Sequence, residues 1–353
     1  MAAYFDHIQE FRTGKLRLVD LRSPGEFKLG AMPNAVNVPL FTDDERAAVG
    51  TTYKQVGQNE AVQMGLEFVA NKMAAFLDEL DHLAGSERRL AIHCWRGGMR
   101  SGSVAKLLQI VGIQPILLTG GYKTYRNQVL KRIDELAHHK LLVLNGRTGC
   151  GKTQLIHELI VRGAPAIDFE GLASHRGSAI GHLNVTSPQP SQQNFENLLA
   201  NSYEAVRNAP TVIVEIEQNI GRIQMPATLR DHIYSSDMIL IERSLEDRVT
   251  HIASEYAPTW TTDDDRKFAE GMLLLKKHLQ GTMYESIMTH VAHRNFSEAI
   301  KLLILHRYDK CYDKAIIRQA DNIKETLSVP LDLTAAIERI LTMASFKPQT
   351  TLV

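Results

Sequence analysis

The chain has 353 residues, and its 40 Lys and Arg side chains balance its 40 Asp and Glu side chains, which excludes a protein that is basic over its whole surface. The apolar fraction of 44% is ordinary for a globular chain with a sizeable core, and the length indicates two domains or one large one. Polar residues interrupt each apolar stretch well before about 18 residues and the N-terminal segment lacks an apolar core, so we expect neither a membrane span nor a signal peptide.

Short apolar runs alternate with helical stretches in the first part of the chain. Strands are expected at residues 16–21, 35–38, 90–93 and 116–118, and helices at 62–83, 101–111 and 122–139. Because strands that alternate with helices form parallel sheets, this part is predicted to be an α/β domain with a parallel or mostly parallel sheet.

A second α/β unit begins at a strand predicted for residues 141–144, which enters a Gly-rich turn and then a helix that starts at Lys152. Further strands are expected at 211–216 and 238–242, and beyond about residue 245 the pattern is mostly helical, including 272–279 and 296–306. We place the boundary near residue 138, which predicts domains at 1–137 and 138–353.

A cysteine directly follows the predicted strand 90–93, in the sequence HCWRGGMRS at residues 93–101. A Gly-rich turn before a helix can point its backbone N–H groups at an anion, and the same field lowers a thiol pKa. We therefore predict that Cys94 is a nucleophile and that Arg96 and Arg100 bind an anion. The alternative is a buried structural cysteine, which two glycines and two arginines disfavour. Three widely spaced cysteines without a Cys-x-x-Cys pair argue against disulfides and a thiolate zinc site and favour the cytoplasm.

At these residues the first part of the chain resembles a rhodanese domain. The resemblance also covers DLRSPGEF at residues 20–27, PNAVNVPL at 33–40 and TGGY at 119–122. The chain departs from the family at Gly30-Ala31-Met32, where Gly-His-Ile is frequent. Five residues separate Cys94 from Arg100, one more than in typical sulfurtransferases and the same as in the Cys-x5-Arg of cysteine phosphatases. The larger loop can enclose a tetrahedral anion such as phosphate or selenophosphate.

A phosphate-binding loop follows the strand 141–144, because GRTGCGKT at residues 146–153 satisfies G-x4-G-K-[ST] between a predicted strand and a predicted helix. Its backbone N–H groups would hold a diphosphate, Lys152 would neutralise the outer phosphate, and Thr153 could hold Mg²⁺. Cys150 is interpreted as a small filler. The residues assigned to this site are Gly146, Arg147, Gly149, Gly151, Lys152 and Thr153.

An acidic partner for this loop is expected at the end of a second strand, where Glu215 and Glu217 point to one face. An edge strand with a solvated acidic face explains the same pattern, and the sequence leaves both readings open. Between the two motifs, His175 and Arg176 lie beside two glycines in the segment 168–181 and are assigned to a second anion or substrate loop, although such residues also occur in ordinary turns.

A rhodanese-like domain joined to a P-loop domain resembles the tRNA 2-selenouridine synthase family over most of the chain. The matching segments are 41–54, 94–101, 146–153, 168–181, 215–221 and, more loosely, 306–313. The resemblance implies a transferase that replaces the 2-thio sulfur of the tRNA wobble uridine with selenium from selenophosphate. It also implies an S-geranyl-2-thiouridine intermediate made with geranyl diphosphate.

Applied to this chain, the resemblance assigns the selenium step to Cys94 as nucleophile or selenium carrier, with Arg96 and Arg100 on the phosphate. Lys152 and Arg147 would hold the diphosphate leaving group. We expect no tightly bound cofactor, no dedicated metal ligands and no stable protein partner, and we leave open a Mg²⁺ ion and nucleotide hydrolysis. The open alternatives are a cysteine phosphatase fused to a kinase-like domain and a sulfur or selenium carrier without tRNA chemistry of its own.

The neutral total charge hides a strong segregation along the chain. Residues 1–87 carry a net charge of −5, residues 88–140 one of +8 and residues 141–353 one of −3. The basic stretch contains the Cys94 loop and the helix that leads to the P-loop. It predicts a tRNA surface made of Lys123, Arg126, Lys131, Arg132 and Lys140.

Overall fold

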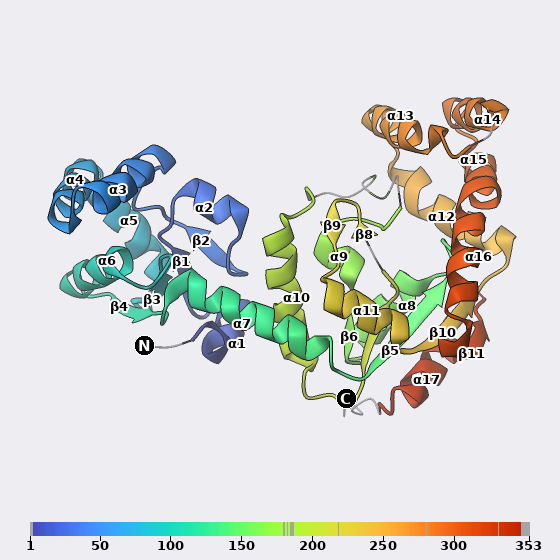
Figure 1. Cartoon of the computed structure of the whole chain (residues 1–353), viewed down its shortest axis with the longest axis horizontal. Helices are drawn as coiled ribbons and strands as arrows, with labels where there is room; N and C mark the ends of the chain where they lie inside the picture. The colour runs from blue at the N-terminus through green and yellow to red at the C-terminus, as the bar shows by residue number, and fades with distance from the viewer. Residues whose placement is uncertain are drawn as a thin grey trace. The chain divides into compact units, whose positions relative to one another are not determined.

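The structure is a computed structural model, and it describes residues 3–178, 181, 183, 187–217, 219–279, 281–330 and 332–346 (Figure 1). Ala179 and Ile180, which belong to the predicted segment 168–181, lie outside the described residues. The chain divides into two compact units, Met1–Lys131 with Ser191–Asn201 and Arg132–Pro190 with Ser202–Val353. The return of Ser191–Asn201 to the first unit was not anticipated from the sequence, and the boundary near residue 138 stays a prediction.

The first unit is built on a parallel sheet, as predicted. In the described part of this unit the sheet has four strands in the order β2-β1-β3-β4. They are β1 (Arg17–Asp20), β2 (Ala35–Asn37), β3 (Arg89–His93) and β4 (Gln114–Leu117). The accompanying helices are α1 (Ile8–Thr13), α2 (Pro24–Leu29), α3 (Asp43–Gln55), α4 (Gln58–Ala70), α5 (Met73–Ala84), α6 (Met99–Ile110) and α7 (Gly121–Leu136). Of the two central strands, β3 ends at His93, directly before Cys94, and β1 ends at Asp20, where the DLRSPGEF motif begins.

The long helix predicted for residues 62–83 is wrong, because two helices, α4 and α5, occupy this stretch. Asn71, a weak helix former, ends α4 as its C-cap. The apolar pattern continues past the break because Val69 and Phe76 pack in the same core. Helix α3 was not predicted, since none of its residues is buried. Its sequence signal is the capping box between Thr42 and Glu45.

The second unit is built on a parallel sheet whose described residues form five strands in the order β11-β10-β5-β7-β6. They are β5 (Leu141–Gly146), β6 (Ala166–Ile167), β7 (Val212–Glu215), β10 (Asp237–Glu242) and β11 (Ile323–Ser328). A separate antiparallel hairpin consists of β8 (Asn219–Ile220) and β9 (Ile223–Gln224). The sequence pattern predicts mostly helices beyond about residue 245 and does not place β11. This strand lies at the edge of the sheet and alternates half-buried with exposed residues, so its apolar signal is weak.

Helices flank this sheet and extend beyond it (Figure 1). They are α8 (Lys152–Val161), α9 (Phe169–Ala173), α10 (Gln192–Val206), α11 (Ala227–Ser235), α12 (Leu245–Tyr256), α13 (Thr262–Lys276), α14 (Gly281–Ala292), α15 (Phe296–Leu303), the π-helical turn η3 (Ile304–Tyr308), α16 (Asp309–Arg318) and α17 (Thr334–Met343). Within the described ranges, no helix has both the length and the apolar character needed to cross a bilayer.

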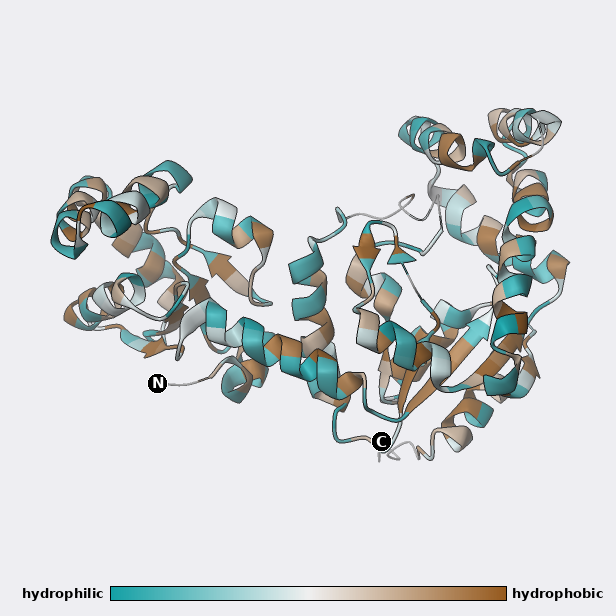
Figure 2. Ribbon diagram, viewed as in Figure 1, coloured by the Kyte–Doolittle hydropathy of each residue, from teal (hydrophilic) through white to brown (hydrophobic). Residues whose placement is uncertain are grey.

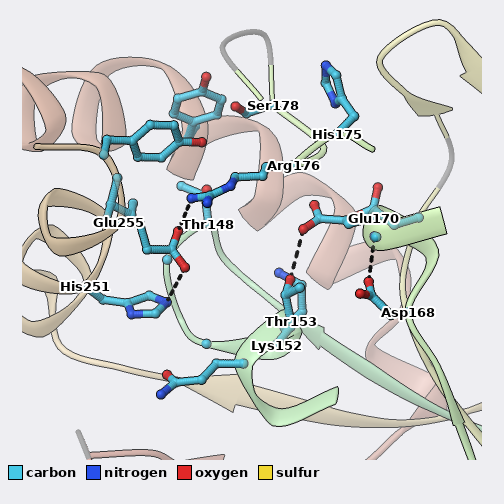
Figure 3. A pocket seen from close by; sticks show the side chains of 18 of the residues that line it. Thr148, Lys152, Thr153, Asp168, Glu170, His175, Arg176, Ser178, His251 and Glu255 are labelled. Carbon is cyan, nitrogen blue, oxygen red and sulfur yellow. Dashed lines mark hydrogen bonds and ion pairs between the residues drawn. The ribbon is translucent and has the colours of Figure 1, made fainter. Parts of the chain in front are cut away.

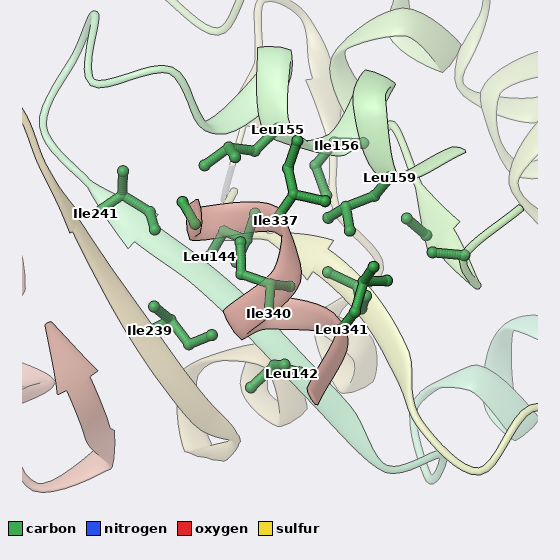
Figure 4. Packing of buried hydrophobic residues seen from close by; sticks show 14 of the residues in the cluster. Leu142, Leu144, Leu155, Ile156, Leu159, Ile239, Ile241, Ile337, Ile340 and Leu341 are labelled. Atoms are coloured by element: carbon green, nitrogen blue, oxygen red, sulfur yellow. The ribbon is translucent and has the colours of Figure 1, made fainter. Parts of the chain in front are cut away.

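The core of the second unit fixes the strand from which the P-loop emerges. Helices α8 and α17 pack on β5 and β10 through aliphatic side chains (Figure 4), and these strands are mostly brown in Figure 2. The facing residues are Leu142, Leu144, Ile239, Ile241, Leu155, Ile156, Leu159, Ile337, Ile340 and Leu341. Each fully buried aliphatic side chain stabilises the fold by about 1.5–3 kcal/mol. The carboxyl end of β5 is therefore held rigidly.

Candidate functional site

The first candidate site is the loop that joins β3 to α6. Cys94 is 3% exposed, and its Sγ lies 3.3 Å from Oγ of Ser101 in the first turns of α6. Burial would raise the pKa of the Cys94 thiol, but hydrogen bonds from Ser101, the Arg100 charge and the backbone N–H of Arg96 together hold it below its usual value. The loop thus favours a thiolate, as the sequence predicted, and Ser101 is a partner that the sequence reading did not assign.

The TGGY motif closes this loop from the N-terminal end of α7. The backbone N–H groups of Tyr122 and Lys123 donate to the carbonyl oxygens of Cys94 and Trp95, both over 2.9 Å. Gly121 has φ +58°, and a Cβ there would lie 2.2 Å from the Cys94 oxygen. Glycine is required here because the two backbones approach too closely for any side chain.

The two predicted anion-binding arginines differ in their surroundings. Arg96 is exposed, whereas Nη1 of Arg100 donates to Oε2 of Glu26 over 2.9 Å. Burial would raise the pKa of Glu26, but Arg100 and its other partners lower it. An anion at Cys94 would therefore share Arg100 with Glu26. Glu26 belongs to the DLRSPGEF motif, so the motif reaches the loop through this ion pair.

The same motif supplies a buried ion pair beneath the loop. Arg22 is fully buried and donates to both carboxylate oxygens of Asp20 and to the carbonyl oxygen of Gly30 over 2.7 Å. Its guanidinium lies 3.7 Å from the centre of the Tyr122 ring. Since Tyr122 in turn binds the Cys94 carbonyl, Arg22 supports the loop and does not line it.

The second candidate site is the P-loop between β5 and α8. Nζ of Lys152 donates to the carbonyl oxygen of Gly146 over 3.0 Å and lies 5.6 Å from the centre of the Tyr312 ring. Burial would lower the pKa of Lys152, but the acidic groups around it, Cys150 and Tyr312 before the glutamates, raise it above its usual value. Lys152 is therefore a permanent cation at the phosphate position.

Three glutamates gather beside Thr153. The Thr153 hydroxyl lies 3.0 Å from Oε2 of Glu170 and 3.1 Å from Oε2 of Glu215. Glu215 is fully buried at the end of β7, which pairs with β5 on one side and β6 on the other, so the reading of β7 as a solvated edge strand is wrong. Glu217 lies just beyond the strand and joins the same cluster.

Burial raises the pKa of all three carboxyl groups, and repulsion by Glu170 adds to this effect at Glu215 and Glu217, so that the pKa of Glu217 rises to about 8. Candidate ligand atoms of Glu170, Glu215 and Glu217 lie within 4.8 Å of one another, and Oε1 of Glu215 has no hydrogen-bond partner among the described residues. Carboxylate and hydroxyl oxygens are the ligands that Mg²⁺ prefers. These residues therefore fit a divalent cation. The sequence reading offered Thr153 for Mg²⁺ and named no carboxylate as a metal ligand. Glu170 lies in the segment 168–181, shortly after β6, and its position alone does not show that it reaches Thr153.

These groups open onto a cavity of about 420 Å³, which we call the P-loop cavity (Figure 3). Its polar wall includes Thr148, Gly149, Gly151, Lys152, Thr153, Asp168, Glu170, His175, Arg176 and Glu217. Its apolar wall comes from α12, α15, η3 and α16 and consists of Ile252, Tyr256, Ile300, Leu303, Ile304, Tyr308 and Tyr312. The cavity thus offers phosphate-binding groups at one side and a hydrocarbon-like surface at the other.

Both residues of the predicted second loop line this cavity. His175 is 8% exposed, and Nη1 of Arg176 donates to Glu255 over 3.0 Å, as the dashed line in Figure 3 shows. Arg147, in contrast, donates to Asp313 over 2.7 Å and lines a different cavity of about 310 Å³. In this structure Arg147 therefore does not face the P-loop cavity with Lys152.

The segment 306–313 fastens the C-terminal helices to the P-loop. Nε of Arg248 donates to the Thr148 carbonyl oxygen over 2.8 Å, and its other nitrogens donate to Asp309 over 3.0 and 2.5 Å. Tyr308 and Tyr312, one residue before each of the two aspartates, face the cavity. Because residues four apart share a helix face, Asp309 and Asp313 reach Arg248 and Arg147 while the tyrosines reach the cavity.

The predicted basic surface is partly neutralised within the protein. Arg126 donates to Glu196 over 2.5 Å, and Arg132 donates to Glu204 over 2.6 Å. Both acids lie on α10, and the sequence reading did not anticipate them. Arg126 and Arg132 are thus already engaged in ion pairs.

The fold and the two sites define a rhodanese-like domain joined to a P-loop domain. A family model of the rhodanese-like domain matches residues 6–128, and a model described as the tRNA 2-selenouridine synthase AAA domain matches residues 139–329. The chain therefore belongs to the tRNA 2-selenouridine synthase family.

Relatives with that name support the assignment. A protein of Nitrosomonas europaea is 40% identical over 252 residues, which cover 69% of this chain and 64% of the relative. A protein of Nitrosomonas eutropha is 39% identical, and the match covers 66% of that relative. A protein of Hydrogenovibrio crunogenus is 33% identical over 345 residues, which cover 89% of this chain and 92% of the relative. The match thus spans slightly less than two thirds of the two Nitrosomonas proteins and most of the third.

Proposed function

We propose that this protein converts the wobble 2-thiouridine of tRNA to 2-selenouridine with selenophosphate, through S-geranyl-2-thiouridine made from geranyl diphosphate. The observation that carries the proposal is the two-sided P-loop cavity. A prenyl diphosphate has a dianionic or trianionic head and a hydrocarbon tail, and the cavity places a P-loop opposite an apolar wall.

In the first step, the diphosphate lies on the P-loop N–H groups and Lys152, and the geranyl chain lies against Leu303, Ile304 and Tyr308. The thiocarbonyl sulfur attacks C1 of the chain while the C1–O bond breaks and the diphosphate leaves with the bonding electrons. Lys152 is fixed by Gly146 and needs no rearrangement to stabilise the charge that develops on the leaving oxygen.

We also propose that Thr153, Glu170, Glu215 and Glu217 hold a Mg²⁺ ion. When bound, such an ion supplies positive charge to the diphosphate. The support is the oxygen-only ligand set and the unpartnered Glu215 oxygen. We expect no other tightly bound cofactor.

In the second step, the Cys94 thiolate attacks the phosphorus of selenophosphate, whose phosphate Arg96 and Arg100 bind, and the P–Se bond breaks to release selenide. The selenide attacks C2 of the base, the C2–S bond breaks, and the sulfur leaves with a proton as geranylthiol. Water then hydrolyses the S–P bond at Cys94 and releases phosphate. The support is the lowered Cys94 pKa, to which the Arg100 charge and the backbone N–H of Arg96 contribute. All three cysteines, each among the described residues, are free thiols, which supports a cytoplasmic location for this chemistry.

One observation favours a second candidate. The Ser101 hydroxyl beside the Cys94 sulfur, in a Cys-x5-Arg loop, also suits a cysteine phosphatase. Turnover of a generic aryl phosphate that disappears in Cys94→Ser would support this candidate. An absence of turnover would remove it.

Reconstitution tests the main proposal. The purified full-length chain is incubated with tRNA that carries 2-thiouridine, geranyl diphosphate, selenophosphate and Mg²⁺, and the nucleosides are analysed by mass spectrometry. We expect S-geranyl-2-thiouridine without selenophosphate and 2-selenouridine with it. Cys94→Ser should stop at the geranylated nucleoside, and Lys152→Ala should not form it. A wild-type protein that needs a second enzyme for both products would instead be a selenium carrier.

A further inference from the structure

A second cavity adjoins the P-loop cavity in the same unit. Its volume is about 830 Å³, within the range of small-ligand sites. We call it the Arg222 cavity, and it is lined by Ser174, His175, Gly177, Ser178, Ser187, Pro188, Gln189, Asn219, Gly221, Arg222, Lys267, Glu270, Gly271 and Leu274. Four of these residues, Ser174, His175, Ser178 and Ser187, also line the P-loop cavity. The two cavities therefore share one wall.

This shared wall is braced by the β8–β9 hairpin. Gly221 has φ +60° in the hairpin turn, and a Cβ there would lie 2.8 Å from Cδ2 of His175. The Gln189 side chain donates to the Ile220 carbonyl oxygen over 2.5 Å and accepts from the Arg222 N–H over 3.1 Å. The Arg222 guanidinium donates to the Gln189 carbonyl oxygen. His175 and Arg222 are thus held in fixed positions on either side of the turn.

The chemistry of the Arg222 cavity differs from that of the P-loop cavity. Its lining combines hydroxyl and amide groups with two cations, Arg222 and Lys267, and one acid, Glu270. Lys267 donates to Asp263 over 2.9 Å, but the two side chains are 37% and 53% exposed. Such an exposed pair is worth little, so a phosphate can replace the carboxylate at Lys267. Amides and hydroxyls bind base edges, and basic side chains bind the phosphate backbone.

We propose that the Arg222 cavity receives the RNA nucleotide whose sulfur accepts the geranyl group. The inference rests on the proposed function, because it assigns the second substrate of the same transfer. A group transfer needs donor and acceptor sites that meet at the reacting atoms. At His175, which lines both cavities, a base in the Arg222 cavity would meet C1 of a chain in the P-loop cavity. Loop bases of RNA are unstacked easily and can enter such a pocket.

The bonds and charges of this geranyl transfer balance. The C1–O bond of geranyl diphosphate breaks and its electron pair leaves with the diphosphate, while a sulfur lone pair forms the C1–S bond. The N3–H proton of the base then passes to solvent, which leaves the neutral S-geranyl nucleoside.

Binding measured by fluorescence anisotropy tests the site without relying on turnover. A labelled anticodon stem-loop RNA is titrated with the full-length protein over a series of salt concentrations. The variants are Arg222→Ala, Lys267→Ala and the double variant. Arg230→Ala is the matched control, because Arg230 is an exposed arginine of the same unit that pairs with its neighbour Asp231 and lines neither cavity.

Each single substitution in the cavity should weaken binding and reduce the slope of log affinity against log salt by about 1, and the double variant by about 2. Arg230→Ala should keep the wild-type slope. Inorganic pyrophosphate should still raise the melting temperature of all four variants as in the wild type, since the P-loop is intact. Wild-type slopes in the cavity variants would overturn the proposal.

A crosslinking experiment locates the base itself. A stem-loop with 4-thiouridine at the wobble position is irradiated in the complex, and the crosslinked peptides are mapped. We expect a crosslink in the Asn219–Arg222 turn or at the His175 wall. Crosslinks only at other segments would contradict the assignment. If the RNA binds in this cavity but wild-type protein forms no geranylated nucleoside, the proposed function fails and the RNA site stands.

Discussion

Arg248 and Asp309 form a two-oxygen ion pair, and the same arginine donates to the Thr148 carbonyl oxygen of the P-loop. Arg248 is 3% exposed, and its partner is 19% exposed. The conformation of the P-loop is therefore coupled to a helix more than 150 residues later in the chain.

Removing the acid of this pair should destabilise the second unit. In Asp309→Asn, a buried guanidinium loses its counter-charge, so we expect the free energy of unfolding to fall by about 3 kcal/mol. Asp313→Asn is the control one turn later, because its pair with Arg147 is about 40% exposed on both sides and should contribute at most about 1 kcal/mol. Urea unfolding measures the free energy of unfolding of both variants. Equal losses in the two variants would refute the coupling.

The Cys94 thiol should titrate below the range of an ordinary cysteine. Only the thiolate is alkylated, so the rate for the Cys94 peptide should reach half its plateau at a pH below about 8.5, the pKa of an ordinary cysteine. Ser101→Ala removes a hydrogen bond that stabilises the thiolate, so its profile should move to higher pH. Mass spectrometry of iodoacetamide-treated protein follows the Cys94 peptide. An unchanged profile in Ser101→Ala would show that the hydroxyl does not set the thiol pKa.

The acidic cluster should make the metal-free protein less stable in alkali. Burial raises the folded pKa of Glu217 to about 8, above its value of about 4.3 in the unfolded chain, so the folded state binds the extra proton between these values. The stability that the Glu217 proton contributes is fully present below about pH 4.3 and is lost as the pH rises through about 8. Melting temperatures in EDTA should therefore fall between pH 6 and pH 9.

In Glu217→Gln this fall should be smaller, because the amide does not titrate. Mg²⁺ should stabilise the wild type more at pH 9 than at pH 6, since protons compete with the ion for the carboxylates. A Mg²⁺ effect that is the same at both pH values, or that survives unchanged in Glu217→Gln, would argue against these ligands.

The apolar wall should select for the length of the prenyl chain. Each buried methylene contributes about 0.8 kcal/mol, which is roughly fourfold in affinity, so geranyl diphosphate should bind much more tightly than the five-carbon dimethylallyl diphosphate. Ile304→Ser should reduce this preference and leave inorganic pyrophosphate binding unchanged. Calorimetric titration of the three ligands measures the difference. A wild-type protein that binds all three equally would exclude the apolar wall from the site.

The sequence predicts the Cys94 loop and the P-loop because a local sequence pattern marks each of them. The Cys94 loop and the P-loop each follow a buried strand and precede a helix, and glycines mark the turn in each case. The positions of strands β3 and β5 were readable for the same reason, since each contains a continuous apolar run bounded by polar residues.

What the sequence did not reveal are partners that lie far apart along the chain. Glu26 meets Arg100, Glu170 meets Thr153, and Asp313 meets Arg147 only after the strands are ordered. The assignment of Arg147 to the diphosphate followed from its position in the motif. The direction of the Arg147 side chain depends on Asp313, which lies more than 160 residues later in the chain, and no local sequence pattern can show this contact. Helix α3 was hidden for the opposite reason, because a helix without buried residues has no apolar periodicity.

The π-helical turn Ile304–Tyr308 sets the rotation of everything that follows it in α16. A π turn carries one more residue than an α turn, and one residue corresponds to about 100° of rotation. Deleting a single residue there would swing Tyr312 away from Lys152 and Asp309 away from Arg248 at the same time. The length of this stretch should therefore not vary, so an insertion or deletion between α15 and α16 would mark a chain that has lost the activity of this site.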